Sequence, residues 1–483
     1  MVGTSKTKIA AIAALSVILP ESALTQSVQQ GVSQRLTTGV TPTRAARSTR
    51  NTGGTQVDIG VGSTLRFDDN FELVPNDGGN TSIFDTNLSV GLSSITSVHN
   101  FNLTGTGVFR YANIPGRTET GFEDPTVRLN YSTSSLNSRL TVTGRYRDVD
   151  RDFLDPFEVE REEQASSGLF ANGGSVRSRN IGATWQTGMA SPIGFTLAGQ
   201  HSNTNYIDTF IPRLFDVETN SGIATLTGRI SPVTQLRTSF GLTDYEAEDI
   251  PQTERLTTDY AVGVVQNINP TLVLDAQIGY TEVETDTTGG TQNRSGGTGA
   301  FTLTQTLPTG SLFANGVLTR NENGSRATFR LGRSLALPNG SLSGSIGFTD
   351  GSGGSSKPIV SLNYLRQIGT DDFSISVDRI PSTNNTSQDI IDTRIALGYG
   401  HVIDSLSRFD VIANLGRSES SGTGGAPTID RANLSATYTR TLTSDWDMTG
   451  GILLRYQDDP TAGGEANSNA VFVTLGRNFS FRP

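Results

Sequence analysis

The chain has no cysteine and only three histidines among its 483 residues. Without cysteine it cannot form disulfides, thiolate metal sites or cysteine nucleophiles. His99, His201 and His401 lie about one hundred residues apart, without the close spacing that a metal site or a catalytic set requires. We therefore expect no enzyme, no resident metal and no cofactor.

Long hydrophobic runs are missing beyond the N-terminal segment. Only 34% of the residues are hydrophobic, whereas 54 are glycine. A transmembrane helix needs about 20 consecutive apolar residues, so helical spans are excluded. A transmembrane barrel is still allowed, because it places apolar side chains only at alternate positions. The formal net charge of −10 argues against a nucleic-acid partner, which would require a basic face.

The N-terminus has the pattern of an export signal. Lys6 and Lys8 precede an apolar stretch at 9–19, and small residues follow near residue 25. This stretch is too short to anchor the chain in a membrane, so we predict a signal peptide at 1–25. Residues 26–55 are polar and without periodicity, which indicates a flexible periplasmic arm.

From residue 56 to 483 the apolar residues alternate with polar ones. Leu272, Leu274, Ala276 and Ile278 occupy one parity of their segment, and polar residues or glycine occupy most of the other. A period of two places the two sets on opposite faces of a β-strand. The same pattern recurs throughout this region and predicts one all-β domain.

The connections between these segments alternate in length. Short turns such as "LPTGS" at 307–311 and "LPNGS" at 337–341 alternate with polar stretches such as "TDTTGGTQNRSGG" at 285–297, which we interpret as long loops. Outer-membrane barrels have short periplasmic turns and longer extracellular loops. We predict a transmembrane antiparallel β-barrel of about 22 strands, within a range of 16 to 22, with both chain ends on the periplasmic side.

The last residues, "VFVTLGRNFSFRP" at 471–483, alternate like the other strands and end in aromatic residues. A sheet edge exposed to lipid would leave several backbone groups without hydrogen bonds, so a membrane sheet must close. We expect this segment to pair with the first strand, at 56–67. Its aromatic end is similar to the signal that the barrel-assembly machinery reads, although Arg482 and Pro483 follow Phe481.

Three opening segments resemble a known family. "LRFDDNFELVP" at 65–75, "FDTNLSVGLSS" and "HNFNLTGTGVFRYAN" are similar to the first strands of β-barrel porins found with exopolysaccharide export systems. The resemblance covers the signal, these strands and the general hairpin rhythm. It implies an outer-membrane channel or export protein and supplies no catalytic residues.

Strand parity predicts which charged side chains face the lumen. We expect a basic, pore-lining wall formed by Arg110, Arg128, Arg139, Arg145, Arg147, Arg237, Arg326, Arg330, Arg394 and Arg455. The segment at 148–163, called the acidic loop below, has eight carboxylates and two arginines. Its candidate constriction residues are Asp150, Asp152, Asp155, Glu158, Glu160, Glu162 and Glu163.

The position of the acidic loop has two interpretations. Folded inward, it would face the basic wall and create a constriction that selects solutes by charge and size. Folded outward, it would meet lipopolysaccharide through divalent cations. The apolar Phe153, Leu154 and Phe157 favour packing against the barrel.

Two functions fit the predicted barrel. The first is a porin-like channel for diffusion or export of polar solutes, including anionic ones or polysaccharide. The second is a structural or adhesive protein whose barrel anchors surface loops. The roughly thirty-residue arm is too short to form a globular plug, which favours an open or loop-constricted pore. Lipid and lipopolysaccharide are the expected surroundings, and the oligomeric state stays open.

Overall fold

The computed structural model contains one closed antiparallel sheet of 22 strands. It describes residues 53–76, 78–153, 174–209, 214–351, 356–383, 389–420, 428–460 and 463–482. The predicted signal and the arm as far as residue 52 therefore lie outside the described residues. Among the described residues, no helix has the length and hydropathy to cross a bilayer.

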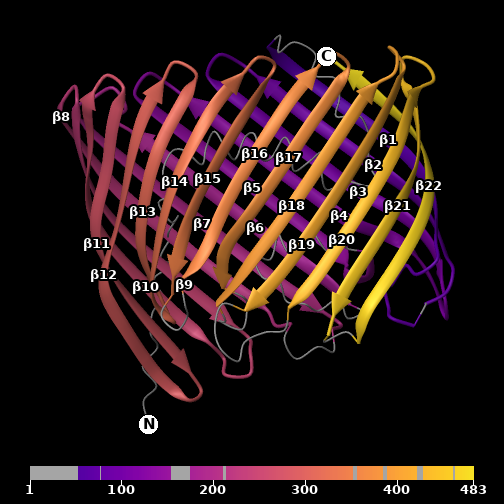
Figure 1. Cartoon of the computed structure of the whole chain (residues 1–483), viewed down its shortest axis with the longest axis horizontal. Helices are drawn as coiled ribbons and strands as arrows, with labels where there is room; N and C mark the ends of the chain where they lie inside the picture. Colours follow the sequence, from indigo (N-terminus) through magenta and orange to yellow (C-terminus); the bar gives the residue numbers. More distant parts are fainter. Residues whose placement is uncertain are drawn as a thin grey trace.

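Each strand pairs with its neighbours in sequence, and the last strand returns to the first (Figure 1). The strands are β1 (Gly54–Asp68), β2 (Thr81–Ile95), β3 (His99–Ile114), β4 (Arg117–Ser134), β5 (Ser138–Asp150), β6 (Ser175–Thr187), β7 (Ile193–Ile207), β8 (Val217–Ser231), β9 (Thr234–Ala247), β10 (Glu254–Asn269), β11 (Leu272–Thr287), β12 (Gly290–Leu307), β13 (Gly310–Asn321), β14 (Gly324–Leu337), β15 (Gly340–Asp350), β16 (Lys357–Ile368), β17 (Asp371–Thr383), β18 (Asp389–Val402), β19 (Ser407–Ser420), β20 (Ile429–Thr441), β21 (Trp446–Asp459) and β22 (Gly464–Phe481).

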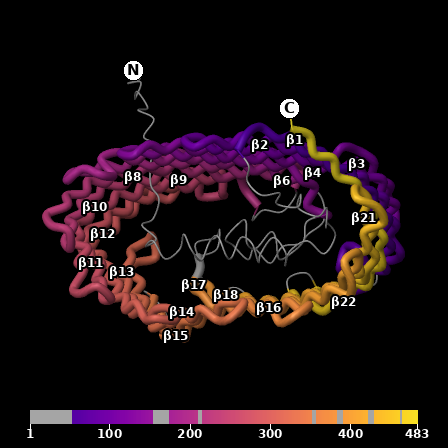
Figure 2. The backbone as a smooth tube through the Cα atoms, turned by 90° about the horizontal axis from the view of Figure 1, so that it is seen from above, coloured from indigo at the N-terminus to yellow at the C-terminus, as the bar shows by residue number. Residues whose placement is uncertain are grey.

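The predicted closure is confirmed. β1 pairs with β22 from Val57 opposite Phe481 to Asp68 opposite Ala470. Viewed from one end, the strands form a flattened ring in which β1 lies beside β22 (Figure 2). The pairing leaves neither the first nor the last strand with a free edge, as a membrane sheet requires.

The outer surface of the barrel is apolar. Large hydrophobic side chains at alternate positions are exposed, among them Phe67, Phe109, Leu331, Ile346 and Val473. An apolar surface that surrounds the whole outside of a barrel is stable only in contact with hydrocarbon. A closed antiparallel barrel with an apolar exterior is the architecture of outer-membrane proteins, and the chain is an outer-membrane barrel.

One predicted loop is wrong. Residues 285–297 form a hairpin in which β11 and β12 continue on either side of a turn at 288–289. In Figure 1 these two strands project past their neighbours. Both faces of this projection are polar because neither meets lipid, so the alternation that identifies the other strands is absent. The acidic loop also begins later than predicted, since β5 extends to Asp150.

Candidate channel lumen

The predicted arginines share strand faces with the least exposed residues of the barrel. Arg110 lies on the face of β3 that carries Ala112 and Ile114, which are 0% and 2% exposed. The opposite face carries Phe109, which is 52% exposed. The same comparison of parities places the other nine arginines on the inner face.

Ion pairs with inward carboxylates include those of four of these arginines. Arg110 donates from Nε and Nη2 to the two Asp85 oxygens, at 2.9 Å each. Arg147 Nε lies 2.9 Å from Asp124 Oδ1. The other two pairs are Arg237 with Asp275 and Arg455 with Asp68. Carboxylates therefore neutralise part of the predicted basic wall.

The other six arginines lie at different heights along the inner face of the barrel. Arg128 on β4 and Arg145 on β5 are directly opposite each other in the strand register. Arg394 on β18 is opposite Asp378 on β17. Arg139 is exposed at the short-turn end of β5, and Arg326 and Arg330 lie on β14.

The β1–β2 connection packs against the inner face. Phe71 from this connection is buried with Ile83, Ala112 and Ile114, and Phe153 packs on the same cluster. The rings of Phe71 and Phe153 have centroids 5.0 Å apart. The Arg110 guanidinium lies 3.7 Å from the Phe153 ring centroid, so it contacts Phe153 as well as Asp85. The first residues after β5 are thereby held against the inner wall.

Only the start of the acidic loop is described. Arg151–Phe153 forms a single 3-10 turn, and the Arg151 N–H donates to the Gly174 carbonyl at 3.0 Å, closing the base of the loop. Asp150 and Asp152 lie in this base. Of the other predicted constriction residues and apolar side chains, Asp155, Glu158, Glu160, Glu162, Glu163, Leu154 and Phe157 lie outside the described residues.

Arg117 joins three parts of the lumen entrance, and sequence parity did not reveal it. Its guanidinium forms ion pairs with Glu72 of the β1–β2 connection at 2.8 Å, with Glu119 of β4 at 2.6 Å, and with Asp152. Arg117 is the first residue after a two-residue turn, where alternation has only begun. Residue alternation gives no signal for this bridge, because Glu72 and Asp152 come from two separate connections.

One group of carboxylates has the geometry of a cation site. Oxygen atoms of Glu119, Asp150 and Asp152 lie within 4.8 Å of one another. Oxygen ligands of this kind suit calcium or magnesium. Two of the three carboxylates already contact Arg117, which supplies positive charge to the group.

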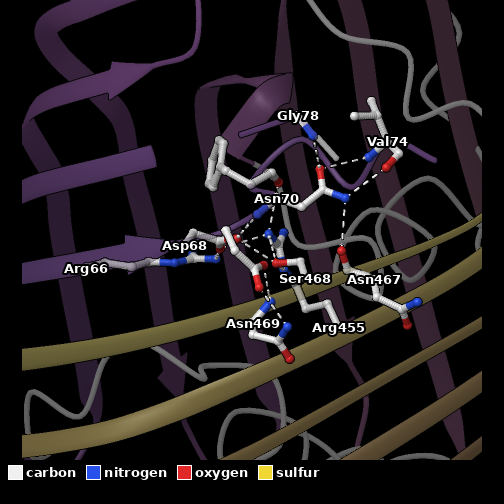
Figure 3. A network of polar contacts seen from close by, with 11 residues as sticks. Arg66, Asp68, Asn70, Val74, Gly78, Arg455, Asn467, Ser468 and Asn469 are labelled. Atoms are coloured by element: carbon white, nitrogen blue, oxygen red, sulfur yellow. Dashed lines mark hydrogen bonds and ion pairs between the residues drawn. The ribbon is translucent and has the colours of Figure 1, made fainter. Parts of the chain in front are cut away.

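A polar network fixes the closing seam beside the same entrance (Figure 3). The buried Asp68 carboxylate accepts hydrogen bonds from Arg455 Nη2 at 3.0 Å and Ser468 Oγ at 2.7 Å. Arg455 also donates to the Phe71 carbonyl at 2.9 Å. This arginine, predicted to line the pore, therefore holds β1, β22 and the β1–β2 connection together.

Asn70 connects the β1–β2 connection to β22. Its Nδ2 donates to the carbonyls of Val74 at 2.8 Å and Asn467 at 2.9 Å (Figure 3). Its Oδ1 accepts from the N–H groups of Val74 and Gly78. One side chain thus shapes the turn after β1 and fixes it to the closing strand, which positions Phe71.

Comparison with solved structures identifies the architecture. The FrpB iron transporter from Neisseria meningitidis aligns with a TM-score of 0.56 and 6% identity, over 92% of this chain and 83% of that chain. The chain has the fold of an outer-membrane β-barrel. A mutant of the ferric enterobactin receptor PfeA from Pseudomonas aeruginosa aligns with a TM-score of 0.54 and 8% identity, over 88% of this chain and 80% of that one.

A third solved structure has the same barrel. The siderophore receptor PirA from Acinetobacter baumannii aligns with a TM-score of 0.54 and 9% identity, over 89% of this chain and 81% of that chain. No protein-family model matches the sequence. No curated protein matches it either. At these identities, the likeness concerns the fold alone.

Proposed function

We propose that the protein is an outer-membrane channel for polar solutes, with a lumen narrowed on one side by the β1–β2 connection and the base of the acidic loop. The observation that carries this proposal is the charged inner face, where ion pairs such as Arg110–Asp85 and Arg147–Asp124 recur on neighbouring strands. A barrel that served only as an anchor would gain more stability from apolar packing inside, since buried ion pairs contribute little.

The solute is proposed to be polar and uncharged or anionic, with polysaccharide as the class suggested by the resemblance of the first strands. Paired arginine and carboxylate side chains can form hydrogen bonds with the hydroxyl groups of a solute without binding the solute tightly. The solute can therefore pass through the lumen. Arg139, which is exposed at the short-turn end and has no ion pair with any described residue, adds a preference for anions.

Planar-bilayer recording of the refolded protein tests this function. We expect stable current steps on the nanosiemens scale, about the range of water-filled pores. A folded protein that gives no steps would contradict the channel and favour the anchoring role. Fold is checked separately by heat-modifiable migration in gels.

Reversal potentials in a salt gradient test the contribution of the arginines. Replacing Arg110, Arg128, Arg145 and Arg147 with glutamine leaves Asp85 and Asp124 without their cationic partners. We expect the permeability to shift toward cations. An unchanged permeability ratio in the folded quadruple variant would mean that these side chains do not line the conducting path.

A second candidate function is uptake of a ferric siderophore complex. The observation that favours it is the strand number, because outer-membrane transporters with 22 strands commonly have a plugged lumen. Titration with ferric enterobactin separates the candidates. Absence of current steps in planar bilayers together with saturable binding of ferric enterobactin would favour uptake. Conductance without binding would favour the channel.

A further inference from the structure

The outer surface of the barrel has an apolar hollow across β11–β16. Its volume is about 700 Å³, and its lining includes Leu303, Leu331 and Ile346. Leu331 and Ile346 are 50% and 67% exposed, which places them on the lipid-facing side of their strands. We call this hollow the outer groove.

The strand register orders the outer groove into two rows. Gln305, Leu312, Arg333 and Gly344 are successive cross-strand partners and form the row nearer the short turns. Leu312 is two residues from the start of β13, whereas Arg333 is four residues from the end of β14 and Gly344 four from the start of β15, so this row lies about 7 to 14 Å along the strands from the short turns. It is the polar end of the groove.

The second row lies two residues further from the short turns along each strand. Leu303, Ala314, Leu331, Ile346 and Val360 are successive cross-strand partners in it. Every member is apolar. The groove therefore changes from polar to apolar in the direction that leads from the membrane surface toward the hydrocarbon, as a phospholipid does.

Arg333 supplies a positive charge at the polar end. It is exposed on the lipid-facing side, and it makes no ion pair or side-chain hydrogen bond with any described residue. Arginine facing lipid is costly at the midplane and tolerated near the interface, where its guanidinium reaches phosphate groups. The fork of guanidinium N–H groups matches phosphate oxygens.

Gly344 leaves space beside this arginine. A Cβ at this position would meet the Ser361 carbonyl oxygen at 3.3 Å and Leu362 Cδ1 at 3.4 Å, so a larger residue would crowd this part of the groove. The absence of a side chain opens a path from Arg333 to the apolar row.

We propose that the outer groove binds a glycerophospholipid of the leaflet on the short-turn side. Its phosphate contacts Arg333, and one acyl chain lies along Leu303, Ala314 and Leu331. Short turns are periplasmic in outer-membrane barrels, so this is a lipid of the periplasmic leaflet. The site is independent of whether the lumen conducts.

Lipid retention tests the site. The protein is reconstituted in vesicles of phosphatidylglycerol and phosphatidylethanolamine and extracted in mild detergent, and the phosphatidylglycerol bound per barrel is measured by native mass spectrometry. We expect the unmodified protein to retain at least one molecule. Arg333→Gln should lower the affinity about tenfold, as loss of a charged hydrogen bond does, whereas Arg333→Lys should retain most binding.

A second variant tests the groove without changing its charge. Ala314→Phe should fill the apolar row and lower retention to a similar degree. Arg440→Gln is the matched control, because Arg440 is an exposed arginine near the short-turn end of β20, far from the groove in the strand order. It should leave retention unchanged.

Two results would overturn the proposal. Equal retention in the unmodified protein, Arg333→Gln and Ala314→Phe would show that lipid does not occupy the groove. A lipid-free dimer that dissociates in Ala314→Phe would show that a second copy of the chain covers it. Heat-modifiable migration establishes that each variant is folded before retention is compared.

Discussion

Arg110 joins the inner wall to the base of the acidic loop, and its removal has a calculable cost. The side chains of Arg110 and Asp85 are 10% and 15% exposed, so solvent screens their pair only weakly. Loss of a hydrogen bond to a charged group costs about 1.5 to 3 kcal/mol. Loss of the contact with Phe153 adds about 0.5 to 2 kcal/mol. We expect Arg110→Gln to lower the free energy of unfolding by about 2 to 5 kcal/mol.

Urea unfolding in detergent, followed by tryptophan fluorescence, measures this change. The double variant Arg110→Gln with Asp85→Asn completes a thermodynamic cycle. Because the second substitution removes the carboxylate left without its partner, we expect a coupling energy of about 1 to 3 kcal/mol. The double variant should therefore be less destabilised than the sum of the single variants.

The same variants distinguish an effect on the loop from an effect on the wall. Phe153→Ala removes the ring beneath Arg110 but leaves the Asp85 pair. We expect it to raise conductance without the shift toward cations that Arg110→Gln causes. Coupling below about 0.5 kcal/mol between Arg110 and Asp85 would refute the reasoning, since additive sites do not interact.

Three further predictions concern the seam, the topology and the closing strand. Asn70→Ala removes four hydrogen bonds and should lower the free energy of unfolding by about 2 to 4 kcal/mol, and a change within experimental error would show that the seam network is not stabilising. An epitope inserted at 288–289 should be labelled on intact cells, whereas one at 308–309 should not, and the reverse result would invert the orientation. Truncation after Leu475 removes the partners of Val57–Gly62 and should prevent assembly, so a heat-modifiable truncated barrel would contradict the role of β22 as the closing strand.

The period-two pattern was sufficient to predict the barrel. Residues such as Leu272, Leu274 and Ile278 reveal a strand face locally, because successive side chains of a strand point to opposite sides wherever the strand lies. The inward parity of the arginines follows from this local rule. The strand number needs the turns between segments as well, and the pairing of the first and last strands follows from the need to close a sheet in lipid. At 285–297 both faces of the strands are polar, so the rule gives no signal. It therefore predicts a loop where the structure has a hairpin.

The tertiary structure decided which charges meet. Arg455 and Asp68 are 387 residues apart in the chain and become neighbours only when β22 closes on β1. Arg117 finds Glu72 and Asp152 because two separate connections fold to the same side of the ring. Such pairs depend on strand register and on loop packing, which residue alternation does not contain. The sequence therefore determined which side chains face inward, while closure of the barrel determined their partners.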